Sequence, residues 1–546
     1  MMPIELLSLD ALPLDGLPSA STLAWAAGCL AVLSVQLYPM LMRFLRLLLH
    51  TYFSKVTVFG VNNFPREGPV ILCPNHPNML VDAILTLSEA ARHGRNPYVW
   101  AKGSLFANPV AAFLLRKFGA VPVYRPRRTA DSLADVDTTK TPEEIEAANR
   151  AMFEHTWRVL AQGNVMVLFP EGTSYTAPKM LALRSGVVRV AAGFVKQYDQ
   201  PVPIVPVGLT YFNKDHFRRY GSVVTVAIVD AANDALSLCA ISQVTLEFGT
   251  PLVITPDEIN AEPYQTDQFA QVKQWMNQLE DKMHSVTLNA SDFDTIRVAR
   301  GMRRLFLNTP GSIAANKEVR LTQFIVDMLE KHAEKSTIAS VRSKVEAYMD
   351  ELERLRMKDQ EVGLPVDKKQ SLLQLFVERV MYLLVLLPLA TPGILLYLPY
   401  YFIASKMNAL AGYTESKSQF KIFAVAFLLP AQWVTLIIAA SMLFGPPYGY
   451  AMGIALPVLL YAHIRVIEES RSLAENVRFL FNITAHADQV AAIREQRQAL
   501  AREVHELVTS YVDPKFLSAV RKSLTNSPPR RRTLRHRPSS TSDMLR

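Results

Sequence analysis

Long uncharged runs constrain this chain more than any other feature of its sequence. Leu23 to Met42, Val380 to Ser405 and Ile422 to Ile464 contain no Asp, Glu, Lys or Arg. About twenty apolar residues in a helix cross a hydrocarbon layer roughly 30 Å thick. The whole chain is 50% hydrophobic and only 20% charged, which is apolar for a soluble protein. We therefore expect part of the chain to lie in a membrane as helices.

The first run has two explanations, a retained membrane anchor or a secretory signal peptide. A signal peptide begins with a basic region and ends at a small-residue cleavage site. The segment before this run is instead acidic, with Glu5, Asp10 and Asp15. We therefore expect residues 1–50 to hold a retained membrane anchor.

The other two runs contain helix-breaking residues at different places. Pro388, Pro392 and Pro399 lie in the second run, which is therefore either a kinked span or a re-entrant segment. The third is interrupted by Gly445-Pro446-Pro447-Tyr448-Gly449 and predicts a helical hairpin. Basic residues flank all three runs at Arg43, Arg46, Lys55, Lys406, Lys417, Lys421, Arg465 and Arg471. The positive-inside rule places these flanks in the cytosol, which requires an even number of crossings between 422 and 464.

Between residues 51 and 255 the sequence alternates strand-like and helical segments. The expected strands are Val70 to Cys73, Ala120 to Tyr124, Val165 to Phe169, Val202 to Thr210, Val223 to Val229 and Val244 to Phe248, and the expected helices include Leu80 to Glu89, Pro142 to Gln162 and Ser185 to Lys196. Such alternation is typical of the α/β class, here a mixed sheet flanked by helices. Thr141-Pro142-Glu143-Glu144 predicts a capped helix start, and 127–140 an exposed insertion.

The rest of the chain divides by composition. Residues 256–370 lose the strands and predict a helical arm with helices over Gln271 to His284 and Asp327 to Met357, followed by a linker at 361–370. The arm is either a regulatory or dimerising element or, as we favour, a helical pair that packs on the α/β domain. Residues 371–470 hold the later membrane segments, 471–525 a helical segment, and 526–546 a disordered tail.

The charge and the cysteines exclude several classes of protein. The net charge of +9 is concentrated in the arginine-rich tail, which is either dispensable or attracted to anionic lipid, and no motif supports nucleic-acid binding. Cys29, Cys73 and Cys239 lie in apolar segments, so we expect neither a disulfide framework nor a nucleophile. A Gly-x-Ser-x-Gly elbow, a Walker loop and a His-Glu-x-x-His pair are all missing from the sequence, which argues against a lipase, an ATPase and a zinc hydrolase. We expect no metal site.

A histidine and an aspartate stand where a strand gives way to a helix. Asn75-His76 follows the apolar run from Pro69 to Pro74, and Asp82 lies in the helical segment beyond. A second polar loop, Phe169-Pro170-Glu171-Gly172-Thr173-Ser174, follows another strand-like run. A histidine beside a carboxylate, with a polar loop that can hold a substrate, indicates base catalysis.

Four sequence blocks in this order and spacing resemble the glycerolipid (PlsC-like) acyltransferase family. Two of the blocks are the histidine and polar loops just described. The second block runs from Lys102-Gly103-Ser104-Leu105 through Phe118-Gly119 to Arg125, and the fourth is Ile204-Val205-Pro206-Val207-Gly208. The resemblance covers about residues 55 to 255, and the combination is more specific than any one block.

The first block departs from the family pattern in one respect. Five residues separate His76 from Asp82, where most of the family has four. The longer spacing is similar to that of the fungal glycerol-3-phosphate and dihydroxyacetone-phosphate acyltransferases. It also puts the geometry of the pair in question.

The resemblance implies a reaction and a site. His76 is expected to be the general base that deprotonates an acceptor hydroxyl, and Asp82 to orient it. The expected substrate-binding residues are Asn75, Lys102, Arg125, Glu171, Gly172, Thr173, Ser174 and Arg184, of which the basic ones suit a phosphate. Acyl-CoA is the expected co-substrate, glycerol 3-phosphate the expected acceptor, and no cofactor is needed. The expected location is the endoplasmic-reticulum membrane, with the catalytic domain in the cytosol.

Two other functions remain open from the sequence. Lysophosphatidate acyltransferases share every residue used above, so the acceptor can also be lysophosphatidate. The extended first block also allows a catalytically inactive, lipid-binding membrane scaffold.

Overall fold

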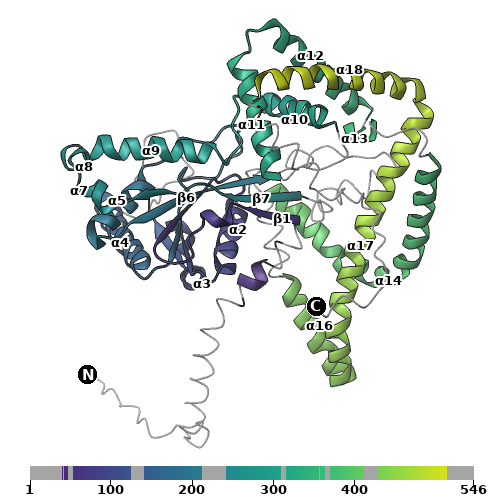
Figure 1. Ribbon diagram of the computed structural model, residues 1–546. Coiled ribbons are helices and arrows are strands. Elements are labelled where there is room, and N and C mark those ends of the chain that lie inside the picture. The colour runs from purple at the N-terminus through teal and green to yellow at the C-terminus, as the bar shows by residue number, and fades with distance from the viewer. Residues whose placement is uncertain are drawn as a thin grey trace, which may run out of the picture.

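The computed structural model describes most of the chain (Figure 1). The described residues are 40, 42–46, 49, 53–124, 141–211, 242–308, 315–355, 357–362, 369–410, 428–512 and 514. Nearly all of the expected N-terminal anchor, the expected strand at 223–229, the insertion at 127–140 and the tail at 526–546 lie outside these ranges. Arg125, Cys29 and Cys239 lie outside them as well.

An eight-stranded mixed sheet forms the centre of the α/β region. Its strands are β1 (Phe53–Phe59), β2 (Val70–Pro74), β3 (Pro97–Lys102), β4 (Ala120–Val123), β5 (Val165–Val167), β6 (Val202–Tyr211), β7 (Ser242–Phe248) and β8 (Leu252–Ile254). Their order is β1-β7-β6-β2-β5-β3-β4, with β8 paired to β6. Strands β2 to β6 run parallel, whereas β7 and β8 are antiparallel to β6 and β1 is parallel to β7. The predicted mixed sheet is confirmed.

Five of these strands were expected from the sequence and three were not. Strands β1 and β3 carry lysines, Lys55 and Lys102, and β8 has only three residues. The apolar pattern of these three strands is therefore less distinct in the sequence than the continuous apolar runs of β2, β5 and β6. Burial on both faces explains those runs, because every residue of β2 and β5 is buried.

Helices cover the two faces of the sheet and bury alternate residues of each strand. In β2, Val70 and Leu72 pack toward α2 (Met79–Arg92), and Ile71 and Cys73 toward the opposite face. That opposite face is covered by α4 (Pro142–Ala161), α5 (Gly186–Tyr198) and α9 (Gln268–His284). The smaller elements are η3 (Val61–Asn63), η4 (Gly103–Phe106), α3 (Pro109–Lys117), α7 (Pro256–Asn260) and α8 (Glu262–Thr266). Thr141 and Glu144 form the expected capping box at the start of α4.

A second hydrophobic core lies in a helical bundle after the sheet. It joins α10 (Phe293–Leu307), α11 (Ala315–Lys331), α12 (Ser336–Arg354) and α13 (Asp359–Val362) to α18 (Ala487–Tyr511), which comes from the far end of the chain (Figure 1). The helical stretch expected over Asp327 to Met357 is interrupted, because α11 ends at Lys331 and α12 begins at Ser336. The break lets the buried residues of both helices join the same core.

Three apolar helices form the remaining part, α14 (Lys369–Leu410), α16 (Leu429–Phe444) and α17 (Pro446–Ala485). Within the described residues, two stretches are long and apolar enough to span a membrane, Val380–Tyr400 and Pro446–Val466, and α16 is a shorter apolar helix. Helix α14 continues through all three prolines, which excludes a reversal inside the second run. Helices α16 and α17 meet at Gly445, where the hairpin turn was expected, and α17 continues past the expected boundary at 470.

Close backbone approach and polar contacts hold these helices together. A Cβ at Gly393 of α14 would lie 2.7 Å from the carbonyl oxygen of Leu459 in α17, so only glycine fits there. The Tyr397 hydroxyl donates to the Leu456 carbonyl (3.2 Å), and the indole of Trp433 donates to Tyr397 (3.2 Å). The three helices therefore pack as one unit.

Candidate active site

The expected site residues gather at one edge of the sheet because they follow parallel strands. His76 comes two residues after β2, Glu171 four residues after β5, and Lys102 ends β3. Strand β6 is parallel to β2 and ends at Tyr211. The carboxyl ends of parallel strands meet at the same edge, which is where α/β proteins place their ligands.

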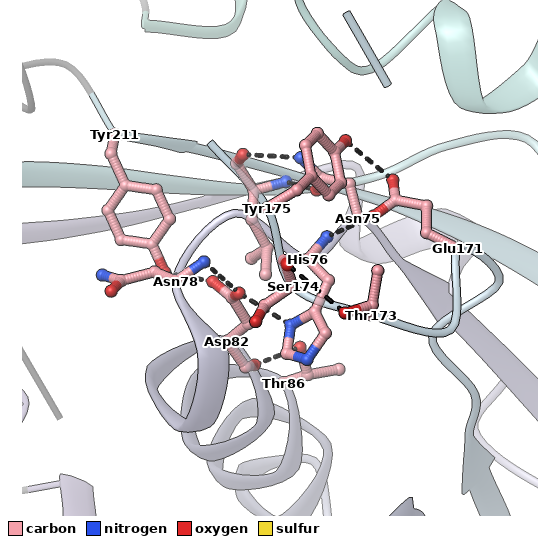
Figure 2. A network of polar contacts seen from close by, with 11 residues as sticks. Asn75, His76, Asn78, Asp82, Thr86, Glu171, Thr173, Ser174, Tyr175 and Tyr211 are labelled. Atoms are coloured by element: carbon pink, nitrogen blue, oxygen red, sulfur yellow. Dashed lines mark hydrogen bonds and ion pairs between the residues drawn. The ribbon is translucent and has the colours of Figure 1, made fainter. Parts of the chain in front are cut away.

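His76 and Asp82 meet despite their longer spacing. The Nδ1 atom of His76 lies 2.9 Å from Oδ2 of Asp82 (Figure 2). Asp82 lies in the first turn of α2 and is fully buried, whereas the imidazole is 17% exposed. The buried carboxylate therefore holds one ring nitrogen while the ring keeps a path to the outside.

Backbone geometry at the start of α2 shows how the extra residue is accommodated. Helix α2 begins at Met79, which has a φ of 44°, and its N-cap Asn78 has φ −145° and ψ 42°. A left-handed conformation is unfavourable for a residue with a side chain. Met79 thus adopts a left-handed conformation between His76 and Asp82, and the two side chains still meet.

Asp82 receives two further hydrogen bonds that the sequence did not indicate. The backbone N–H of Asn78 donates to Oδ2 at 2.6 Å, and the hydroxyl of Tyr211 donates to Oδ1 (Figure 2). Tyr211 stands 129 residues further along the chain, at the end of β6. A backbone amide, a phenol and an imidazole thus hold the two oxygens of the Asp82 side chain in place.

The imidazole of His76 is held on its face as well as at Nδ1. Its ring stacks on Phe169, with 3.9 Å between the ring centroids and an interplanar angle of 23°. Among the residues that the structure describes, none hydrogen-bonds to its Nε2. The second ring nitrogen is thus available to a substrate.

Glu171 was expected to bind substrate, but its carboxylate is used inside the protein. It is buried and accepts from the His76 backbone N–H (3.1 Å) and from the Tyr175 hydroxyl (2.9 Å). Burial raises the pKa of the Glu171 carboxyl to about 8, although both hydrogen bonds act in the opposite direction. In this structure Glu171 ties the polar loop to the histidine loop.

The remainder of the polar loop is open to a ligand. Gly172 has a φ of 73°, which favours glycine, and the carbonyl of Phe169 accepts from its N–H at 3.1 Å. Thr173 is exposed and Ser174 is half-buried. Figure 2 shows both side chains beside His76. Their hydroxyls can therefore contact an acceptor bound at the imidazole.

The other expected binding residues take different positions. Asn75 is buried and joins β2 to β6, because its amide donates to the Leu209 carbonyl (3.1 Å) and accepts from the Leu209 N–H (2.6 Å). Arg184 is exposed, and its Nε donates to the Glu171 carbonyl at 3.2 Å. Lys102 is exposed at the same sheet edge. Asn75 thus positions the histidine loop, while Arg184 and Lys102 remain candidates for an anionic ligand.

Cys73 lies close to this site in sequence but is chemically inert. It is fully buried in β2 as a free cysteine, and burial raises the pKa of its thiol far above the ordinary range. A thiol without access to solvent or substrate does not act as a nucleophile.

Two protein families match separate parts of the chain. Residues 55–210, which include the whole site described above except Tyr211, match the Acyltransferase family. Residues 298–517 match the family described as the glycerol-3-phosphate acyltransferase 2 C-terminal domain. The second match includes most of the helical bundle and all three apolar helices.

Curated relatives resemble most of the chain at low identity. An uncharacterised acyltransferase of Schizosaccharomyces pombe is 23% identical over 86% of this chain and 80% of its own length. Glycerol-3-phosphate O-acyltransferases 1 and 2 of Saccharomyces cerevisiae are 24% and 26% identical. Those matches cover 71% and 58% of this chain, and only 57% and 41% of the yeast proteins.

One solved structure is also similar in part. The crystal structure of the 1-acyl-sn-glycerophosphate (LPA) acyltransferase from Thermotoga maritima matches 45% of this chain and 80% of its own, with 18% identity and a TM-score of 0.27. The two family matches and the relatives agree with the motifs of the site. Residues 55–210 are therefore an acyltransferase domain, and the protein is an acyltransferase.

Proposed function

We propose that this enzyme transfers the acyl group of acyl-CoA to the sn-1 hydroxyl of glycerol 3-phosphate, forming lysophosphatidate. We extend the proposal to dihydroxyacetone phosphate as a second acceptor. The observation that supports it most strongly is the His76–Asp82 pair at the sheet edge, where Nδ1 of His76 lies 2.9 Å from Oδ2 of Asp82. The other ring nitrogen, Nε2, makes no hydrogen bond to a described residue. The names of the two Saccharomyces cerevisiae relatives support the acceptor.

In the proposed reaction the acceptor itself is the nucleophile. Nε2 of His76 takes the proton of the hydroxyl as its oxygen attacks the thioester carbonyl. The carbon–sulfur bond then breaks, and the departing CoA thiolate receives the proton from the imidazolium. The reaction balances without an enzyme nucleophile or a cofactor, and acyl-CoA is the co-substrate.

Asp82 has an orienting role in this proposal. A neutral imidazole that donates Nδ1–H to a carboxylate carries its lone pair on Nε2. The carboxylate also stabilises the imidazolium that forms when Nε2 takes a proton. Asn78 and Tyr211 support the same role, because their hydrogen bonds fix the carboxylate.

Basic side chains are proposed to bind the acceptor phosphate. The guanidinium of Arg184 is anchored through Nε to the Glu171 carbonyl, and its terminal nitrogens make no hydrogen bond or ion pair with the described residues. Paired N–H groups of this kind bind a phosphate through two hydrogen bonds. Lys102 and Arg125 complete the proposed cationic set, and Thr173 and Ser174 bind the acceptor beside His76.

The proposed location is the endoplasmic-reticulum membrane. The apolar stretches Val380–Tyr400 and Pro446–Val466, long enough to cross a bilayer, support a membrane location. The basic residues beside these runs favour a cytosolic catalytic domain, where acyl-CoA is made.

A graded set of variants in microsomes tests the mechanism. With labelled acyl-CoA and glycerol 3-phosphate, His76→Ala is expected to lower the rate by roughly 10² to 10⁴. Asp82→Asn is expected to lose less, and Tyr211→Phe about tenfold, because only one hydrogen bond to the carboxylate is removed. His284→Ala is the matched control, since that histidine is exposed on α9 and, among the described residues, pairs with Glu280 alone.

The same microsomes test the acceptor and the alternative functions. Glycerol 3-phosphate, dihydroxyacetone phosphate and lysophosphatidate are supplied in parallel. Full activity of His76→Ala contradicts the mechanism, and activity with lysophosphatidate alone contradicts the acceptor. A folded wild-type protein that transfers acyl groups to none of the three would instead be a lipid-binding scaffold.

A further inference from the structure

The segment η4–α3 exposes large apolar side chains beside the catalytic edge. Leu105 is 53% exposed and Phe113 59%, and Leu114 is exposed as well. Leu115 and Phe118 on the inner side of the same segment already pack into the core below α2. A surface helix of a soluble protein normally turns polar residues outward. This segment is apolar on both sides, so its outer face lacks the expected polar cover.

Two basic side chains lie at one end of this apolar face. Arg116 and Lys117 are exposed at the end of α3, and the ammonium group of Lys117 lies 5.7 Å from the centre of the Phe113 ring. The sequence from 90 to 130 contains Lys and Arg residues but no Asp or Glu. Exposed apolar side chains next to basic ones are typical of a segment that lies in the headgroup layer of an anionic membrane.

The position of the segment fits the same partner. Helix η4 begins directly after β3, at the edge where His76 lies. In Figure 1, α3 lies on the lower side of the α/β region, the side toward which α16 and the Pro446 end of α17 project. Helix α3 thus lies on the side of the α/β region toward which α16 and the apolar end of α17 project.

We propose that the η4–α3 face, formed by Leu105, Phe113 and Leu114 with Arg116 and Lys117, docks on the surface of an anionic lipid bilayer. The apolar side chains enter the headgroup layer, and the two cations contact lipid phosphates. The catalytic edge is then held at the membrane surface. This inference does not depend on which acceptor the enzyme uses.

Fluorescence quenching in lipid nanodiscs tests the proposal with the full chain. Phe113→Trp places a reporter on the face, and brominated lipid quenches only tryptophan that contacts the bilayer. Phe269→Trp is the matched control, because Phe269 is 73% exposed on α9, away from the proposed membrane side. All samples share the five native tryptophans, and the parent protein supplies their background. Thermal unfolding of each variant in detergent confirms that it is folded.

In nanodiscs that contain phosphatidylserine, the reporter of Phe113→Trp is expected to be quenched at least twofold more than the reporter of Phe269→Trp. Adding Arg116→Glu and Lys117→Glu to Phe113→Trp is expected to remove most of this excess. Equal quenching of the two reporters would overturn the proposal, and an unchanged excess in the charge-reversed protein would overturn the role of anionic lipid. A reporter in Phe113→Trp that is shielded from iodide but not quenched by brominated lipid would mean that protein covers this face, which also overturns it.

Discussion

Two carboxyl groups at the site have different partners. Asp82 accepts hydrogen bonds from an imidazole, a backbone amide and a phenol. Glu171 is buried with two donors, and burial dominates, so the pKa of its carboxyl rises to about 8. Asp82 is thus placed to orient the His76 imidazole, whereas Glu171 joins the polar loop to the histidine loop.

Glu171 is expected to make folding stability depend on pH. Because its pKa is about 8 in the folded protein and ordinarily 4.5, the folded state binds this proton more tightly than the unfolded chain. The resulting stabilisation is complete below about pH 4.5 and is lost as the pH rises through 8. Glu171→Gln is neutral throughout, so its unfolding temperature should match the wild type near pH 4.5 and exceed it increasingly toward pH 8.

Unfolding temperatures of the detergent-solubilised proteins between about pH 4.5 and 8.5 measure this difference. Glu262→Gln is the control, because that side chain is exposed on α8 and its replacement should leave the difference constant. A Glu171→Gln protein whose unfolding temperature runs parallel to the wild type at every pH would contradict the assignment.

The sequence predicted the centre of the site but not its surroundings. His76, Asp82 and the loop from Glu171 to Ser174 could be found because motif and strand-to-helix context coincide at each. Tyr211 could not, because its contact with Asp82 depends on β6 lying beside β2, and strand order is not encoded locally. Its one available signal was its place at the end of an apolar strand. The inward direction of the Asn75 and Glu171 side chains is likewise set by tertiary packing.

At the scale of elements, α18 is bound to the bundle by two ion pairs of contrasting burial. Arg497 contacts Asp359 through Nε (2.8 Å) and Nη2 (3.1 Å), and both side chains are buried. Tyr348 donates to the same carboxylate at 2.7 Å. Lys344 of α12 pairs with Glu503 of α18 at 2.8 Å on the surface.

The two pairs are expected to differ strongly in their effect on stability. Arg497→Met leaves the Asp359 carboxylate buried without its cation, which should cost about 3–5 kcal/mol of unfolding free energy. Lys344→Met should cost less than about 1 kcal/mol, because water already screens that pair. Urea unfolding of both variants measures the difference, and equal losses would contradict it. Replacing Asp359 by Asn together with Arg497→Met should recover part of the loss, since no buried charge then remains.

Strands and helices could be predicted from the sequence where a local pattern of apolar or capping residues marks them. Strands buried on both faces and helices with a capping box, such as α4 and α7, stand out locally. The turn between α11 and α12 does not, because a polar segment of good helix formers gives no stop signal there. The break follows instead from the hydrophobic core that α11 and α12 share with α18, a helix more than a hundred residues further along the chain.

At the scale of the whole molecule, the hairpin of α16 and α17 sets the topology. If both helices cross the bilayer, the turn at Gly445 faces the lumen and the bundle faces the cytosol. In a chain whose native cysteines are replaced by serine, Tyr448→Cys should react with an impermeant maleimide only after sealed microsomes are permeabilised. Glu334→Cys in the bundle is the control and should react without permeabilisation. Labelling of position 448 in sealed microsomes would contradict the double crossing.

Helix α17 continues far beyond its apolar span before it reaches α18 (Figure 1). From Val466 to Ala485 it extends about 30 Å, at about 1.5 Å per residue. A rigid helix of this length transmits a tilt, and a tilt of about 10° at its membrane end moves the other end by roughly 5 Å. A mismatch between bilayer thickness and the length of an apolar span can be relieved by a change of tilt, which gives the lipid composition of the membrane a mechanical route to the helical bundle.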